Sequence, residues 1–234
     1  MRKTENSIVD GVIWKQLLLF FFPILIGTFF QQLYNTVDTV VVGQYVGKQA
    51  LAAVGTTGTV INLLVGFFVG LSSGATVIIS QFFGAGDGKN VSKAVHTSIA
   101  LALAGGLVIM VLGLLTARPS LVLLGVPEEI LGDALTYMNV YYCGIIASMI
   151  YNVGTGVLRA IGDSRMPLYV LIVCCLVNIV LDLLFVLGFH WDVFGVAIAT
   201  VLSQVVSAVL IMARLMLTRE SYRVELKRIR FDKS

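Results

Sequence analysis

Two aspartates lie inside long apolar stretches of the 234-residue chain, where charged side chains are rare. Asp38 falls in an apolar run from residue 16 to 43, and Asp182 falls in a run from 167 to 188. Inside a lipid bilayer a charged group costs several kcal/mol unless it faces the interior of a helix bundle or water. Because a buried carboxylate can bind and release a proton or a cation, both aspartates are candidate functional residues.

Two further polar residues share the predicted depth or helix face of these aspartates. At a rise of about 1.5 Å per residue, Asp38, Asp182 and Thr200 lie about 9 to 12 Å below the same membrane surface. Asn178 precedes Asp182 by four residues and therefore lies on the same helix face. Two carboxylates in one polar cavity would not titrate independently, and a proton or a cation would satisfy the pair. This arrangement predicts ion-coupled transport.

Polar residues near Asp38 and in the fourth apolar run have two explanations each. Gln31 and Asn35 form a polar stripe with Asp38 at helical spacing, and Tyr34 lies one turn before the carboxylate. They either line a cavity or hydrogen-bond between helices. For Asn152, which lies in a stripe of small residues, packing is the preferred explanation. The aspartates themselves could merely bond to a neighbouring helix.

The elements that must position these residues are apolar helices. The chain is 58% hydrophobic and 12% charged, whereas soluble domains carry about 25% charged residues. This composition excludes a soluble enzyme and a disordered chain. We predict an all-α integral membrane fold, a six-helix transmembrane bundle. Its spans cover residues 16–43, 51–83, 94–117, 131–158, 167–188 and 194–217.

The distribution of positive charge predicts the orientation of the bundle. All but two of the sixteen lysines and arginines fall on one side of the predicted membrane, and the exceptions are Lys48 and Arg118. The positive-inside rule therefore predicts a multi-pass protein of the cell (inner) membrane with both termini cytoplasmic. We divide the chain into a cytoplasmic N-terminus (1–15), a six-helix lobe (16–217) and a basic cytoplasmic tail (218–234). The tail would lie on the anionic inner leaflet or serve as a loose linker.

Small residues and glycine-rich turns indicate how the helices pack and connect. Small residues recur at every fourth position in three runs, including Gly66, Gly70 and Gly74 in the second, which favours close approach of helix backbones. The loops GAGDGK (84–89) and AIGDSR (160–165) share a Gly-Asp pattern followed by a basic residue. We predict that both loops are tight turns.

Nothing in the sequence predicts catalysis or a cofactor. The three cysteines lie in apolar runs, and His96 and His190 lie near opposite membrane surfaces, so neither set suggests a metal centre. The GxGD sequence of intramembrane proteases occurs at 84–87, but in a predicted loop. We therefore expect no enzyme activity, no nucleic-acid partner and no metal other than Na⁺ at the candidate cation site.

Six stretches together resemble the multidrug and toxic compound extrusion (MATE) transporters over about residues 14–213. They are QQLYNTVDTVVVGQYVG (31–47, after Pro23), SQFFGAGDGK (80–89), GVPEEI (125–130), GVLRAIGDSRMPL (156–168), NIVLDLLFVLGF (178–189) and GVAIATVLSQ (195–204). Their order and spacing make the resemblance specific. Members of this family have twelve helices in two lobes around a cleft that opens alternately to either side. This chain resembles the first lobe.

The resemblance also assigns roles to individual residues. It places the cation site of the family's first lobe on Asp38, Asn178, Asp182 and Thr200. It implies that Gln31, Tyr34, Tyr137, Asn152 and Thr155 line the cavity.

The function implied is cation-coupled (H⁺ or Na⁺) multidrug antiport by alternating access, with small organic, cationic or amphiphilic substrates. The expected partners are the lipid bilayer and a second lobe or a second copy of the chain. Two alternatives remain open. One is a lipid-linked oligosaccharide flippase of the same superfamily, whose cavity should be rich in basic residues, and the other is a transport-inactive truncated lobe.

Overall fold

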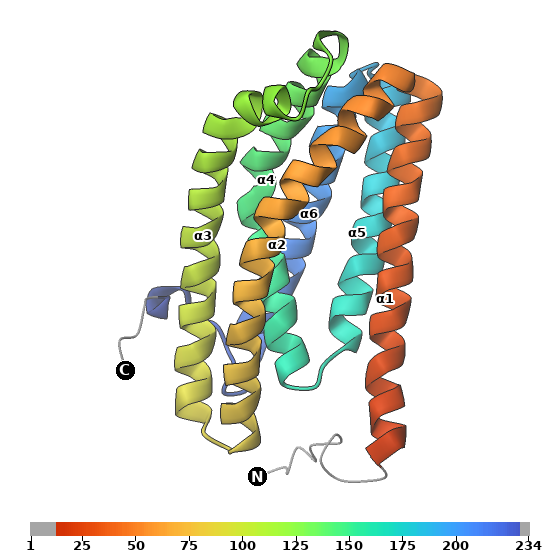
Figure 1. The fold of residues 1–234 in the computed structure, drawn as a ribbon. Coiled ribbons are helices and arrows are strands. Elements are labelled where there is room, and N and C mark those ends of the chain that lie inside the picture. Colours follow the sequence, from red (N-terminus) through yellow and green to blue (C-terminus); the bar gives the residue numbers. More distant parts are fainter. Residues whose placement is uncertain (1–12, 230–234) are drawn as a thin grey trace.

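The computed structural model describes residues 13–229, and in this range the chain is helical with no strands. The long helices are α1 (Ile13–Val41), α2 (Lys48–Gly84), α3 (Gly88–Leu123), α4 (Glu128–Ala160), α5 (Arg165–Leu183) and α6 (Asp192–Leu217). The predicted all-α membrane fold is confirmed (Figure 1). By length and hydropathy, five described segments could cross a membrane; α2 is not among them. Six membrane spans therefore stay a prediction.

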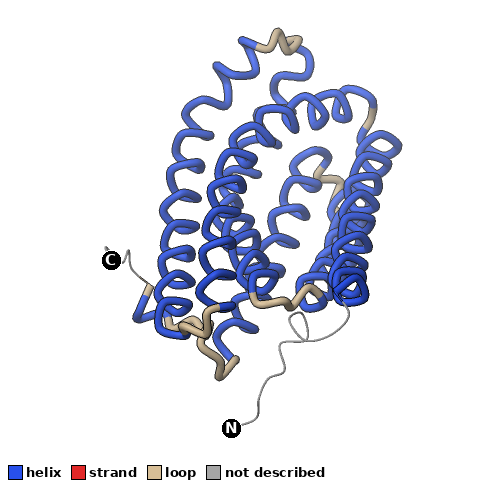
Figure 2. Tube along the Cα trace, turned by 60° about the horizontal axis from the view of Figure 1, so that its bottom comes forward, coloured by secondary structure: helices blue, strands red, loops and turns tan. Residues whose placement is uncertain are grey.

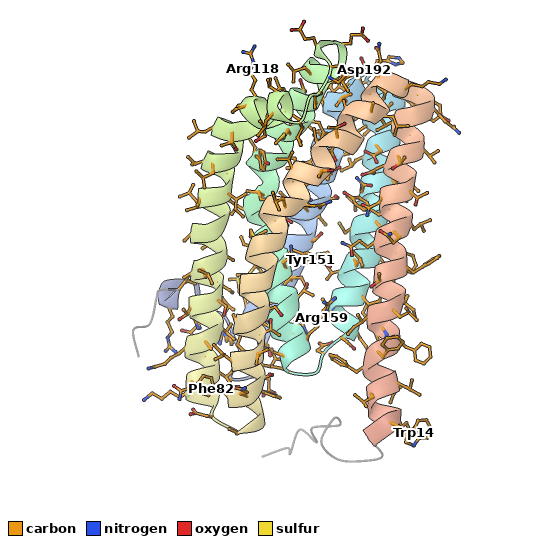
Figure 3. All side chains as sticks on the ribbon, in the orientation of Figure 1. Trp14, Phe82, Arg118, Tyr151, Arg159 and Asp192 are labelled. Atoms are coloured by element: carbon orange, nitrogen blue, oxygen red, sulfur yellow. The ribbon has the colours of Figure 1, made fainter. Side chains whose placement is uncertain are left out.

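The helices run alternately up and down, so the connections gather at two ends. Trp14, Phe82 and Arg159 lie at one end of the bundle, and Arg118 and Asp192 lie at the other (Figure 3). We call the first the basic end, because Lys89 and Lys93 lie near the start of α3 and Arg165 begins α5, and the second the far end. Figure 2 shows the same alternation from a tilted view.

Helix α4 lies at the centre of the packing, and α1 lies at its margin. α4 packs against α2, α3 and α6, whereas α1 packs against α5, which in turn packs against α6. The interior face of α4 buries large side chains completely, among them Met138, Tyr142, Ile145 and Leu158. α1 and α2 meet at the far end and separate toward the basic end (Figure 1).

Glycines in α3 and α4 allow α4 to pack closely against both α3 and α6. A methyl group added at Gly113 would lie 2.6 Å from the ring of Tyr142, and one added at Gly144 would lie 2.6 Å from Val201. The stripe of Gly66, Gly70 and Gly74 in α2 behaves differently, because a methyl group at any of the three would meet no atom within 4 Å. The regular spacing alone thus does not identify a buried helix contact.

Both Gly-Asp loops form the predicted tight turns, and they do so in the same way. Gly86 has φ +72° and Gly162 has φ +89°, a conformation that glycine adopts without strain. The aspartate that follows each glycine caps the next helix: Asp87 accepts a hydrogen bond from the Asn90 backbone (3.1 Å), and Asp163 accepts one from the Met166 backbone (3.0 Å). These caps explain the shared sequence pattern at the basic end.

Two spans end in π-helical turns that the sequence pattern does not reveal. Val42–Val46 extends α1, and Leu184–Gly188 extends α5. The first span therefore ends at Val46 rather than at residue 43, whereas the end of the fifth agrees with the predicted 188. The two π-helical turns lie close together at the far end.

Residues 218–229 pack onto the bundle, although the sequence suggested a tail on the membrane surface or a loose linker. Tyr222 and Val224 are buried, and the backbone N–H of Val224 donates to the Leu215 carbonyl (3.0 Å). The predicted boundary at 217 marks the end of α6 but not the end of the packed unit. Residues 1–12 of the predicted N-terminal segment and residues 230–234 of the tail lie outside the described residues.

Candidate functional site

Helix α5 carries the most deeply buried part of the candidate site. Asn178 and Asp182, one turn apart, are both completely buried. This face of α5 is enclosed because α5 packs between α1 and α6. The opposite face of the same helix carries Leu176 and Val180, which are well exposed. The sequence of α5 thus directs the polar pair Asn178 and Asp182 inward and apolar side chains such as Leu176 and Val180 outward.

Asp38 reaches this pair from α1. It is half-buried, and its carboxylate interacts with the side chains of Asp182 and Asn178. The contact between α1 and α5 is therefore what brings the two aspartates together, although they are 144 positions apart in the sequence.

Helices α4 and α6 provide hydroxyl groups next to the carboxylates. Thr200 of α6 is buried (2% exposed), and Tyr34 of α1 and Tyr137 of α4 both interact with it. The Thr200 hydroxyl donates to the Val196 carbonyl (3.0 Å). Because its hydrogen is committed to this bond, the oxygen lone pairs are left to accept a hydrogen bond or to coordinate a cation.

Several buried oxygens and nitrogens in this cluster lack a hydrogen-bond partner. They are Oδ1 of Asp38, both carboxylate oxygens of Asp182 and both amide atoms of Asn178. Buried polar atoms are nearly always paired, because leaving them unpaired costs free energy. Binding a proton or a small hard cation would lower this cost, since such cations prefer carboxylate, amide and hydroxyl oxygens. The donor set fits the predicted coupling ion.

Gln31 and Asn35 lie outside this cluster. Both are exposed on α1, and the Asn35 side chain donates to Gln32 Oε1 of the same helix (3.3 Å). Helical spacing correctly placed them near the helix face of Asp38. Because α1 packs mainly against α5, residues slightly to the side of that contact remain exposed. Of the predicted polar stripe, Asp38 turns toward α5, and the other two stay at the surface of the lobe.

Asn152 and Thr155 lie further along α4 toward the basic end. Asn152 is half-buried, and its side-chain nitrogen donates to the Ser148 carbonyl one turn earlier (2.8 Å). Thr155 is buried, and its hydroxyl oxygen has no hydrogen-bond partner, although it lies next to Tyr151. Tyr151 lies midway along the bundle in Figure 3. These residues continue the polar interior away from the aspartates.

Two polar residues beside the site were missed in the sequence. Gln204 of α6 donates to the hydroxyl of Tyr141 of α4 (3.4 Å), and the rings of Tyr137 and Tyr141 stack with centroids 6.3 Å apart. Helical spacing could have found both, because Tyr141 follows Tyr137 by four positions and Gln204 follows Thr200 by four. They link the tyrosines beside the aspartates to Ser148, which lies next to Tyr141.

The π-helical turns follow directly after the aspartates. Val42–Val46 begins four residues after Asp38, and Leu184–Gly188 begins two residues after Asp182. A π-turn inserts an extra residue into the helix and frequently marks a functional site. Here the two π-helical turns, which follow the carboxylates in α1 and α5, contact each other at the far end.

Comparison with known proteins identifies relatives of this arrangement. The sequence model of the MatE family matches residues 23–184. The chain is 30% identical over 207 residues to the probable multidrug resistance protein YoeA of Bacillus subtilis, covering 87% of this chain and 45% of YoeA. It is 31% identical over 195 residues to the probable multidrug resistance protein YpnP of the same organism, covering 83% of this chain and 44% of YpnP.

A solved structure agrees with the sequence relatives. An outward-facing multidrug resistance MATE family transporter of the MOP superfamily matches with a TM-score of 0.90 at 28% identity, covering 100% of this chain and 52% of that one. The chain thus spans about half the length of the relatives it matches. These relatives are transporters and resistance proteins, which agrees with the prediction that the chain is not an enzyme. From the family match and the shared fold, the chain belongs to the MatE family of membrane transporters.

Proposed function

We propose that this chain forms one lobe of a cation-coupled exporter of small organic molecules. The observation that carries the proposal is the pair of interacting carboxylates from α1 and α5, whose buried oxygens, Oδ1 of Asp38 and both of Asp182, lack a hydrogen-bond partner. H⁺ or Na⁺ would be the coupling ion, with Asn178 and Thr200 supplying neutral oxygens beside Asp38 and Asp182. The relatives named as multidrug resistance proteins support the export of drug-like substrates.

The two carboxylates could couple the ion to a change of conformation. An ion can drive a switch only through different affinities for the two states, so the site must differ between them. Asp182 comes from a helix enclosed on both sides, whereas Asp38 comes from α1, which packs mainly on α5. A change in the α1–α5 contact would alter the distance between the carboxylates and hence the affinity for the ion.

An acidic site beside tyrosine rings suits an organic cation. Tyr34, Tyr137 and Tyr141 lie beside or near Asp38. Aromatic faces and carboxylates both attract positive charge. In this mechanism the substrate and the coupling ion compete for one negatively charged cavity. The transport cycle needs a second lobe or a second copy, since this chain spans about half the length of its relatives.

The flippase alternative is not favoured. A pyrophosphate-bearing substrate calls for lysine or arginine in the cavity, and the buried polar residues described around the two aspartates are amide and hydroxyl side chains. The transport-inactive lobe is the alternative that an experiment must separate from the proposal.

The test is export by the purified chain in proteoliposomes under an imposed proton or sodium gradient. Asp38→Asn and Asp182→Asn should each abolish gradient-driven efflux of a fluorescent organic cation. Asp133→Asn, which changes an exposed carboxylate on α4, is the matched control and should export like the wild type. Wild-type export by Asp182→Asn would contradict the site assignment. A folded wild-type chain that exports nothing would favour the inactive lobe.

A further inference from the structure

His96 lies at the basic end of α3 and fastens a segment from far along the chain. It is buried (4% exposed), and its Nε2 accepts a hydrogen bond from the Glu225 backbone N–H (3.0 Å). The segment that it holds, Thr218–Ile229, we call the strap. In Figure 1 the strap leaves α6 in dark blue and crosses the lower end of the bundle to the outer side of α3.

Several other contacts hold the strap in this position. The Val224 N–H donates to the Leu215 carbonyl at the end of α6 (3.0 Å), and Val224 is 2% exposed. Ser221 lies against the start of α3, where a methyl group added at Gly88 would come within 3.0 Å of its Cβ. The strap therefore ties the basic ends of α3 and α6 together, and the His96 bond is its hydrogen bond to α3.

The partners of His96 fix its protonation state. Its Nδ1 lies 2.7 Å from the Ser92 carbonyl oxygen, which can only accept a hydrogen bond, so Nδ1 carries a hydrogen. The Glu225 N–H can only donate, so Nε2 must present a lone pair. The strap is thus fastened to the neutral ring. In the charged ring both nitrogens carry hydrogens, and the Nε2 hydrogen would face the Glu225 N–H.

We propose that His96 is a second proton-binding site of this lobe, remote from the two aspartates, and that proton binding there releases the strap from α3. Histidine is the side chain whose charge ordinarily changes between about pH 5 and 8. Release would weaken the tie between α3 and α6 at the basic end, the end that the positive-inside rule predicts to be cytoplasmic. This release of the strap does not depend on the proposed transport activity.

The charged groups around His96 bear on its protonation. At the basic end, on α3, α4, α6 and the strap, they include Asp87, Lys89, Lys93, Arg159, Arg214, Arg219, Glu220, Arg223, Glu225 and Arg228. Glu225 is the acidic residue whose backbone N–H is bonded to the ring, and its carboxylate forms an ion pair with Arg228 Nε (3.0 Å). Titration of Glu225 is therefore the competing explanation for any pH response of the strap, and it needs its own control.

The experiment is hydrogen–deuterium exchange of the purified chain in lipid nanodiscs at about pH 7.5 and about pH 5.5, corrected for the intrinsic pH dependence of exchange. In the wild type, peptides covering 222–227 should lose protection by about five- to tenfold at the lower pH, because one hydrogen bond is lost. Peptides from the α4–α5 turn serve as the internal reference and should keep their protection.

Three variants separate His96 from other causes. His96→Gln keeps an acceptor near the position of Nε2 and does not titrate, so its strap should stay protected at both pH values. His96→Leu cannot accept a hydrogen bond and should leave the strap unprotected at both. Glu225→Gln should respond to pH like the wild type. Protection of the wild-type strap that does not change with pH, or a response retained in His96→Gln, would overturn the proposal.

Discussion

Helices α1 and α4 both supply side chains to the candidate site, yet their surroundings differ strongly. Of the residues in the most apolar stretch of each span, 6% are buried in the span of α1 and 50% in that of α4. α4 packs on α2, α3 and α6, whereas α1 is held mainly by α5. Tyr137 is therefore fixed in a dense interior, and Asp38 is presented by a marginal helix. The candidate site thus combines residues of the well-packed helix α4 with residues of α1, which has fewer neighbours.

The glycines of α4 and α2 show the same contrast. Added methyl groups at Gly144 and Gly154 of α4 would collide with side chains of α6, whereas those at Gly66, Gly70 and Gly74 of α2 would meet nothing within 4 Å. Within the lobe, the small residues of α4 form a close helix–helix contact, and those of α2 do not. The difference teaches that small-residue spacing predicts a helix face suited to close contact, and the fold decides whether a neighbour occupies that face.

The largest effect should come from filling a tight glycine in α4. In Gly154→Ala the new methyl group would overlap Ile211, and such overpacking costs about 1 to 3 kcal/mol. Gly66→Ala, the matched change in α2, meets no neighbour and should gain up to about 1 kcal/mol from the better helix propensity of alanine. Thermal unfolding in detergent would measure both. Equal stabilities would break the contrast between the helices.

Asp182→Asn should stabilise the lobe more than Asp38→Asn does. Asp182 is completely buried with both oxygens unpaired, so removing its charge should gain about 1 to 3 kcal/mol, whereas half-buried Asp38 should gain less. This gain in the free energy of unfolding is largest at a pH where the wild-type carboxyl is ionised, and it becomes smaller as the pH falls and the carboxyl is protonated. Unfolding temperatures measured across pH would check this. A larger gain for Asp38→Asn would show that α1 encloses its residues better than α5 does.

Amides on the buried and exposed faces should differ in their effect on ion binding. Asn178→Ala removes the amide beside the aspartates and, under the proposed function, should weaken binding of the proposed coupling cation about tenfold. Asn35→Ala changes an exposed residue of α1 and should leave the affinity unchanged. Isothermal titration with Na⁺, or measurement of proton release, would compare them. A loss of affinity in Asn35→Ala would instead place the polar stripe of α1 in the site.

The smallest effect is expected at the tyrosine pair beside the site. Tyr141→Phe removes the long hydrogen bond from Gln204 (3.4 Å) but keeps the ring that stacks on Tyr137, so it should cost about 0.5 to 1 kcal/mol. Thermal unfolding should show a small decrease with no change in ion affinity. A decrease as large as that of Gly154→Ala would show that the hydrogen bond, rather than the packing, holds α4 to α6 here.

Much of the fold could be predicted from the sequence because a membrane imposes length and hydropathy on each helix. The six apolar runs correspond to the six long helices in the described part of the chain, and the Gly-Asp pattern predicted the turns at Gly86 and Gly162. The π-helical turns after Asp38 and Asp182 were not predicted, since a one-residue insertion leaves no clear trace in hydropathy. The packed strap was missed because alternating basic and apolar residues also suit a membrane surface.

For the candidate site, the sequence by itself determined the residue types and the helix face of each. Helical periodicity placed Asn178 with Asp182 and Tyr34 with Asp38, because spacing of three or four residues is a local property. Only the tertiary structure decided which faces meet. The α1–α5 contact joins Asp38 to Asp182, leaves Gln31 and Asn35 exposed, and α4 packing on α6 adds Tyr141 and Gln204. Contacts between distant helices depend on side-chain packing, which local spacing does not encode.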